Sequence, residues 1–157
     1  MVKLVLFLGV LFGATAVVAG AMEHSVRGMI VSDVSGGDAE EAGAELSDPA
    51  PNAEVAKRLS QYETGVKYHM YHGLALIGLG VVMAISARGQ VLGGIAAVSM
   101  IIGVTLFSGT LYLISALGMT QLIMVVPIGG SIMILGWILF LITVLLFEPL
   151  VDREDLE

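Results

Sequence analysis

Four long apolar stretches without a charged residue are the feature that most constrains this chain. They cover residues 4–21, 68–87, 91–117 and 122–147. A helix needs about 20 mostly apolar residues to cross a bilayer. The backbone amides of a membrane segment must also be satisfied within that segment, which favours helices over open strands. The sequence therefore predicts an all-α integral membrane protein with four transmembrane helices.

Composition excludes several other classes of protein. Charged residues make up 13% of the chain and hydrophobic residues 57%, whereas a soluble domain is about 25% charged. So few charges cannot cover the surface of a soluble enzyme, and so many apolar residues argue against disorder. The chain has no cysteine, which excludes disulfides and thiolate metal sites. Its net charge of −7 argues against binding to nucleic acid.

The connections between the apolar stretches predict the order of the helices. Residues 88–90 and 118–121 are too short for anything but tight turns, which favours an up-down four-helix bundle formed by a single membrane domain, residues 1–157. Residues 28–51, rich in Gly, Ala, Ser, Pro and acidic residues, predict a flexible acidic insert. We expect order to return at Asn52, which can cap a helix that continues into the second membrane segment. Residues 148–157 form an acidic tail.

The first apolar stretch has an alternative interpretation. Lys3, the apolar run and Ala19-Gly20-Ala21 also fit a secretory signal peptide with its cleavage site. If the stretch is retained, four crossings place both termini on the same side of the membrane. Arg88 lies in a short turn on that side, which favours a cytoplasmic location for both termini.

The predicted topology gathers the unusual residues of the membrane segments near the side opposite the termini. At 1.5 Å per residue, His72 and Pro127 each lie only about 8 Å inside their segments. The candidate functional cluster consists of polar, aromatic and helix-breaking residues that would meet in this leaflet: His24, Tyr68, His69, His72, Ser108, Thr110, Tyr112, Pro127, Gly129, Gly130 and Trp137. Any function located in the bundle is expected there.

The histidines have a structural and a functional interpretation. His72 can sit neutral in a bundle if both of its ring nitrogens find hydrogen-bond partners. Ionisable residues in membrane segments are also functional candidates, so His72 could serve a proton relay or, with His24, bind a metal or haem. A metal site needs three or four ligands, and the sequence fixes no third one. We therefore predict no metal ligand and no cofactor.

Other residues indicate how the helices pack. Small residues spaced four apart, such as Gly9 and Gly13 or Ser99 and Gly103, favour close helix contacts in lipid. Trp137 is deep in its segment and is expected inside the bundle, where its indole N–H needs a partner. Pro127 is expected to kink the fourth helix.

Sequence motifs of catalysis are absent from the chain. There is no G-x-S-x-G, H-E-x-x-H or P-loop pattern, and the acidic residues lie outside the membrane segments. We therefore predict no catalytic residues and no enzymatic activity.

Four groups of residues carry a resemblance to a known family. They are Gly20-Ala21-Met22-Glu23-His24, the stretch from Tyr68 to His72, the stretch from Phe107 to Tyr112, and Pro127 to Gly130 with Gly136-Trp137. In this order they resemble the YgdD-like family of small membrane proteins, domain of unknown function family 423. The resemblance implies four transmembrane helices, an uncleaved first segment and a bacterial inner membrane, and it implies no activity. The chain departs from the family in its long acidic stretch.

These observations favour a non-enzymatic structural or accessory component of the membrane. Its expected partners are the lipid bilayer and other membrane proteins or further copies of the chain. Two alternatives remain open: a small transporter or channel-like protein that uses the polar cluster, and a metal or haem binder that uses His24 and His72.

Overall fold

The computed structural model of the protein describes residues 1–35 and 49–150. Its regular elements are α1 (Val2–Ala21), α2 (Glu23–Val34), α3 (Pro49–Ile85), α4 (Gln90–Leu117), the short 3-10 helix η2 (Thr120–Leu122) and α5 (Val125–Leu145). The prediction of an all-α fold is confirmed. What the sequence predicts for residues 36–48 and 151–157 lies outside the described residues.

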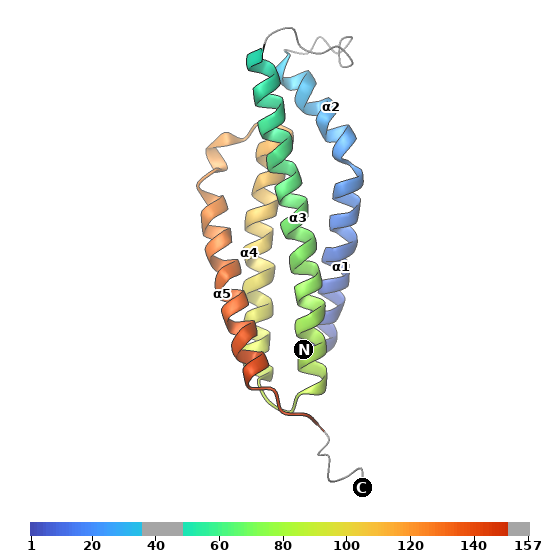
Figure 1. Ribbon diagram of the computed structural model, residues 1–157, viewed down its shortest axis with the longest axis vertical. Coiled ribbons are helices and arrows are strands. Elements are labelled where there is room, and N and C mark those ends of the chain that lie inside the picture. The colour runs from blue at the N-terminus through green and yellow to red at the C-terminus, as the bar shows by residue number, and fades with distance from the viewer. Residues whose placement is uncertain (36–48, 151–157) are drawn as a thin grey trace.

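Four helical segments are long and apolar enough to cross a membrane. They are Val2–Ala21, Asn52–Ile85, Gln90–Leu117 and Thr120–Leu145. The number of segments agrees with the four apolar stretches of the sequence. The helices run alternately up and down, and the start of α1 and the end of α5 lie at the same end of the molecule (Figure 1).

Helices occupy both ends of the range 28–51, in which the sequence predicts the acidic insert. Residues 28–34 belong to α2, which follows α1 after only Met22. Val26 and Ile30 of α2 are buried against Val55 and Tyr62 of α3, and their spacing of four places them on one helical face. At the other end, α3 already begins at Pro49, so Asn52 is not its cap. Proline is favoured at the first position of a helix, since its missing N–H would have no partner there.

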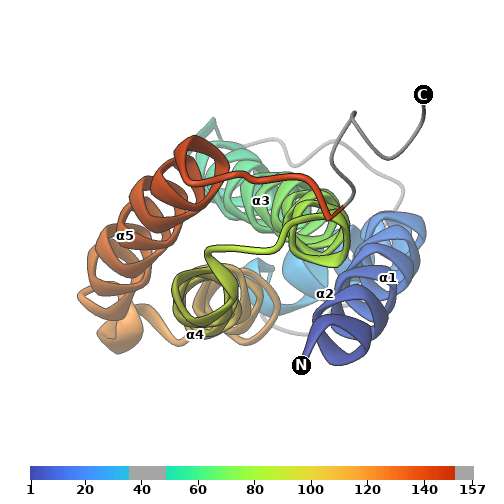
Figure 2. The same cartoon turned by 90° about the horizontal axis from the view of Figure 1, so that it is seen from below.

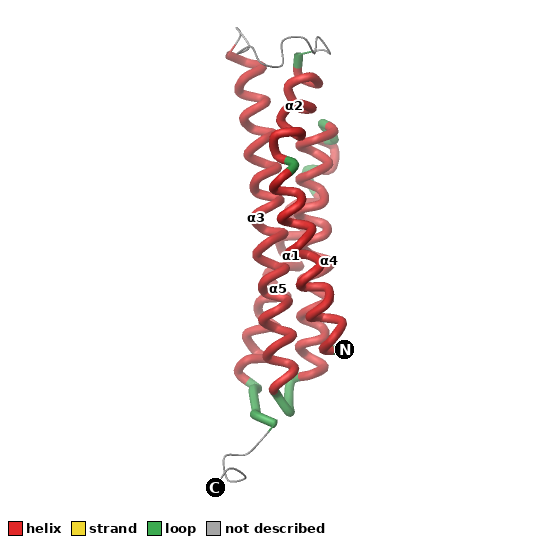
Figure 3. The backbone as a smooth tube through the Cα atoms, turned by 90° about the vertical axis from the view of Figure 1, so that its right-hand side faces the viewer, coloured by secondary structure: helices red, strands yellow, loops and turns green. Residues whose placement is uncertain are grey.

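The long helices are arranged in a row rather than in a closed square. Extensive packing joins α1 to α3, α3 to α4, and α4 to α5. Seen along the bundle, α1 and α5 therefore lie at opposite ends of the row, with α3 and α4 between them (Figure 2). The side view shows α2 and the upper part of α3 extending beyond the other helices, at the end away from the termini (Figure 3).

Glycine allows the close approach of neighbouring helices. A Cβ atom at Gly129 of α5 would lie 2.6 Å from the backbone nitrogen of Phe107 in α4. A Cβ atom at Gly9 of α1 would lie 2.8 Å from the backbone nitrogen of Ile77 in α3. Because real Cβ atoms do not approach backbone atoms this closely, the helix pairs pack through bare backbone, as the small-residue spacing predicts.

Ser86 connects the turn between α3 and α4 to the chain that follows α5. Its hydroxyl accepts hydrogen bonds from the backbone N–H groups of Arg88 and Glu148 and donates to the carbonyl of Arg88. The Arg88 guanidinium also pairs with the Glu148 carboxylate at 2.5 Å. These contacts fix the turn between α3 and α4 against the chain that follows α5.

Pro127 does not kink the fourth membrane helix as predicted, because it lies where α5 begins. η2 and a turn interrupt the fourth apolar stretch before the proline, and α5 begins at Val125. Pro127 thus lies in the first turn of α5, where a backbone N–H has no intrahelical acceptor in any case. The missing donor costs nothing at this position, which explains why the helix continues without a break.

Candidate functional site

Among the described residues, a groove lies on each side of the contact between α3 and α4. The α1–α4 groove has a volume of about 350 Å³ and is lined by Leu11, Phe12, Thr15, His69, Val104, Thr105, Ser108, Gly109 and Tyr112. The α3–α5 groove has a volume of about 210 Å³ and is lined by Tyr68, His72, Phe107, Gly130, Met133, Ile134 and Trp137. Seven of the eleven residues of the predicted cluster line these grooves, three in the first and four in the second.

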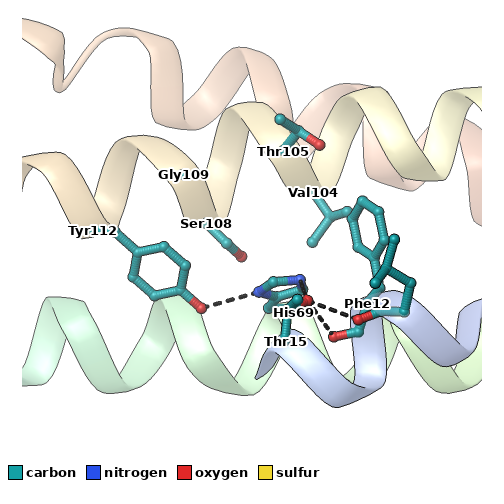
Figure 4. Close-up of a pocket in the computed structure, with 9 residues that line it drawn as sticks. Phe12, Thr15, His69, Val104, Thr105, Ser108, Gly109 and Tyr112 are labelled. Carbon is teal, nitrogen blue, oxygen red and sulfur yellow. Dashed lines mark hydrogen bonds between the residues drawn. The ribbon is translucent and has the colours of Figure 1, made fainter. Parts of the chain in front are cut away.

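His69 is the centre of a hydrogen-bonded chain in the α1–α4 groove. Its Nδ1 lies 3.2 Å from the Tyr112 hydroxyl and its Nε2 lies 3.3 Å from Thr15 Oγ1. Thr15 Oγ1 lies 2.8 Å from the carbonyl oxygen of Leu11, to which its hydroxyl donates. Both ring nitrogens of His69 therefore face hydroxyl groups, which can donate or accept a hydrogen bond. Figure 4 shows these side chains converging from α1, α3 and α4.

His72 is held by different partners in the α3–α5 groove. Its Nδ1 lies 2.8 Å from the carbonyl oxygen of Tyr68, which can only accept. The indole Nε1–H of Trp137 donates to His72 Nε2 at 3.2 Å. Both ring nitrogens of His72 are thus satisfied with the proton on Nδ1. This arrangement provides the two partners that a structural histidine requires.

Trp137 fits its prediction in one respect only. Its indole N–H has the partner that a deep tryptophan needs, but the residue is 47% exposed. The ring lies at the open side of the α3–α5 groove, stacked beside Phe140. The interpretation of Trp137 as a residue enclosed in the bundle is therefore wrong, because the row of helices leaves this side open.

The remaining candidates have mixed positions. Ser108 and Thr110 are buried in α4, and Gly129 forms the close contact between α4 and α5. Pro127 is exposed in the first turn of α5. His24 is exposed on α2 and lines neither groove.

Metal ligation finds no geometric support in the part of the chain that the structure describes. No group of three or more His, Cys, Asp or Glu side chains there could hold a metal ion. His72 also has both ring nitrogens occupied by protein partners.

Arg58 is a buried charge that the sequence reasoning did not single out. Its side chain is 6% exposed, and its Nη1 contacts Asp33 of α2 at 2.6 Å. Its Nε donates to the carbonyl oxygen of Ser115 in α4 at 2.9 Å. Arg58 therefore joins three helices. The available signal was its spacing from Val55 and Tyr62, which places it on the buried face of α3.

The two grooves share one chemical character. Their polar side chains are neutral and largely paired with one another, and the surrounding walls are aliphatic or aromatic. Such sites suit apolar molecules with a few hydrogen-bonding groups. Together with the four spans, they define an integral membrane protein with grooves that open sideways between its helices.

Comparison with known proteins gives the family. The chain matches the family described as "Protein of unknown function (DUF423)" over residues 42–130, and it belongs to that family. The matched range contains both groove histidines, Ser108 and Tyr112. It does not contain the first membrane segment or Trp137, which the resemblance also drew upon.

Named relatives are membrane proteins of bacteria. The chain is 36% identical to the UPF0382 membrane protein YwdK of Bacillus subtilis over 55% of its length and 69% of the relative. It is 36% identical to a UPF0382 membrane protein of Haemophilus influenzae over 53% of its length and 64% of the relative. Identity to the UPF0382 inner membrane protein YgdD of Escherichia coli is 32%, over 55% and 65% of the two chains. No solved structure matches significantly.

Proposed function

We propose that the protein is a non-enzymatic accessory component of the membrane that binds other membrane constituents from the side. The observation that carries this proposal is the pair of separate grooves, each of which lies between helices that are not closely packed against each other. Molecules dissolved in the bilayer reach such grooves without entering water.

The two end helices support contacts with other membrane proteins. In the apolar windows of α1 and α5, only 17% and 22% of residues are buried, compared with 39% and 44% for α3 and α4. A helix in lipid gains stability by packing its apolar surface against another helix. The unpacked faces of α1 and α5 are therefore the surfaces that a partner or a second copy would cover.

The distribution of polar groups favours this role over transport. A transporter needs a site that is reached alternately from both sides, commonly at broken helices near the midplane. Here the polar residues form two sets, and the core nearer the termini consists of Leu76, Leu79, Met83, Met100 and neighbouring apolar residues. The only interrupted membrane segment is broken at its end, before Val125, within the residues that the structure describes.

Two measurements test the accessory role. A photo-reactive residue at Val17 of α1 or Leu141 of α5, both exposed, is expected to form specific protein adducts in native membranes, while the same residue at Gly28 of α2 forms none. Purified protein in liposomes is expected to release no entrapped ions or small solutes. Saturable release that disappears in His69→Ala or His72→Ala would instead support the transporter alternative.

A further inference from the structure

Ser108 places a polar group without a partner in the α1–α4 groove. The residue is 2% exposed, and its hydroxyl has no hydrogen bond among the described residues. In Figure 4 the hydroxyl points from α4 toward the side of the groove that holds His69. A buried donor without an acceptor is costly, so such a group calls for a specific explanation.

The other polar side chains of the chain through His69 do not provide that acceptor. Tyr112 and Thr15 each form a hydrogen bond with His69, and Thr15 Oγ1 also lies 2.8 Å from the carbonyl oxygen of Leu11. None of these groups is in hydrogen-bonding geometry with Ser108. The Ser108 O–H is therefore left without an acceptor, which favours a ligand that carries one.

The surroundings of Ser108 define the rest of the ligand. The groove contains no charged side chain, and most of its wall is formed by Leu11, Phe12, Val104 and the ring of Tyr112. Charged groups would lack counterions there, so the ligand is neutral. A volume of about 350 Å³ lies within the range of small-molecule sites.

We propose that the α1–α4 groove binds a neutral, membrane-soluble molecule through a carbonyl oxygen that accepts a hydrogen bond from Ser108. Two membrane sources provide this chemistry, the ring carbonyl of a quinone and the ester carbonyl of a lipid. This proposal rests on the proposed function, because it names a ligand for one of the two grooves that carry that function. The two can fail separately, since photo-crosslinking at Val17 and Leu141 tests the accessory role at surfaces outside this groove.

Gly109 offers a means of closing the groove without disturbing the fold. It lines the groove, and a Cβ atom built on it meets nothing within 4 Å. Gly109→Leu therefore fills the space that a ligand needs. The matched control is Gly28→Leu in α2, where a Cβ atom also meets open space far from the groove lining.

Binding is measured by native mass spectrometry on the purified full chain in mild detergent. The probes are a benzoquinone with one isoprenoid unit and dioctanoylglycerol, each titrated separately. Ser108→Ala is expected to weaken binding of the accepted probe by about 3- to 10-fold, the value of one neutral hydrogen bond. Gly109→Leu is expected to abolish it. Ser131→Ala, which removes an exposed hydroxyl outside the groove, and Gly28→Leu are expected to bind as the parent does.

The outcomes distinguish a quinone from a lipid ester as the ligand, and they show whether the proposal fails. Binding of one probe with the expected loss in both groove variants supports the proposal and identifies the source. Binding that is unchanged in Ser108→Ala and Gly109→Leu shows adsorption to the outer surface and overturns the proposal, as does no binding of either probe. Circular dichroism confirms that the variants keep their helices. Unliganded Ser108→Ala is expected to be at least as stable as the parent, because it removes an unsatisfied donor.

Discussion

Two histidines one turn apart on α3 have partners of different kinds. His69 meets two hydroxyl groups, from Thr15 and Tyr112, whereas His72 meets a carbonyl and an indole N–H. Each imidazole is satisfied as the neutral form, which suits a membrane interior, where an unpaired charge is expensive. The histidines thus connect helices on either side of the α3–α4 contact.

Replacing His72 tests its bond to the indole of Trp137. His72→Ala leaves the indole N–H without its acceptor and is expected to cost about 1 kcal/mol of unfolding free energy. Because Trp137 is the single tryptophan of the chain, its fluorescence spectrum reports this site directly. The spectrum is expected to shift in His72→Ala and to stay unchanged in His69→Ala. An unchanged spectrum in His72→Ala would contradict the bond.

Arg58 is expected to hold α2 against the bundle. Arg58→Ala removes the contacts to Asp33 and to the Ser115 carbonyl, at an expected cost of about 2 kcal/mol for charged hydrogen bonds. Arg58→Lys keeps the charge but cannot reproduce the forked geometry, so its cost is expected to be intermediate. Unfolding in detergent measures both, with Lys57→Ala, an exposed neighbour, as the control. Equal stability of Arg58→Ala and the parent would show that the ion pair is not formed.

Residue chemistry was predictable only in part. The need of a buried histidine and of Trp137 for partners follows from their side chains, but the identity of each partner does not. His69 and Tyr112 are brought together by the packing of α3 against α4, which no local pattern encodes. The burial of Arg58 was not predicted from the sequence. A charged residue is expected to be exposed, even where its spacing places it on the apolar face of a helix.

At the scale of helices, glycine positions divide into contact and groove positions. Gly129 and Gly103 lie where α4 and α5 meet through their backbones, and added Cβ atoms would come within 2.7 Å of backbone nitrogens. Gly109, on the groove side of α4, faces open space. The same residue type therefore serves packing at one position and an opening at another.

A pair of alanine substitutions tests this division. Gly129→Ala is expected to destabilise the protein by about 1–3 kcal/mol, because its Cβ would force α5 away from Phe107. Gly109→Ala is expected to stabilise it by about 0.5 kcal/mol, since alanine favours the helix and meets no atom. Unfolding of both variants in the same detergent provides the comparison. A destabilising Gly109→Ala would mean that the groove is closed in solution.

The elements themselves were largely predictable from hydropathy. Four uncharged stretches predicted four spanning helices, and their short links predicted antiparallel neighbours. α2 was not predicted, because the composition of the whole connection is dominated by acidic residues and glycine. The spacing of Val26 and Ile30 is nevertheless that of a helix face. The start of α5 at Val125 was missed because an apolar run does not reveal where a turn interrupts it.

At the scale of the whole molecule, four crossings are expected to place both termini on one side of the membrane. We expect that side to be the cytoplasm, on the basis of Arg88 in the short turn between α3 and α4. Reporter fusions at each terminus are expected to give cytoplasmic signals in intact cells. A C-terminal reporter active outside the cytoplasm would reverse the orientation, and reporters on opposite sides would contradict the four crossings.

The open row of helices is the feature from which both grooves and the proposed functions follow. Composition and spacing could not predict it, because a closed square and an open row bury the same apolar stretches. The row is determined by which helix faces carry small residues, and those faces bring α1 to α3 and α4 to α5. Nothing in the loop lengths distinguishes the two arrangements.

Disulfide cross-linking between paired cysteines tests the open row most directly, since the natural chain has no cysteine. A Cβ atom added at Gly20 of α1 would lie 3.5 Å from Val66 of α3, and one added at Gly130 of α5 would lie 3.8 Å from Phe107 of α4. Cysteines in these two pairs are expected to cross-link within one chain in native membranes, whereas the recombined pair Gly20 and Gly130, from α1 and α5, is expected not to. Efficient cross-linking of Gly20→Cys to Gly130→Cys within one chain would show a closed bundle and contradict the account.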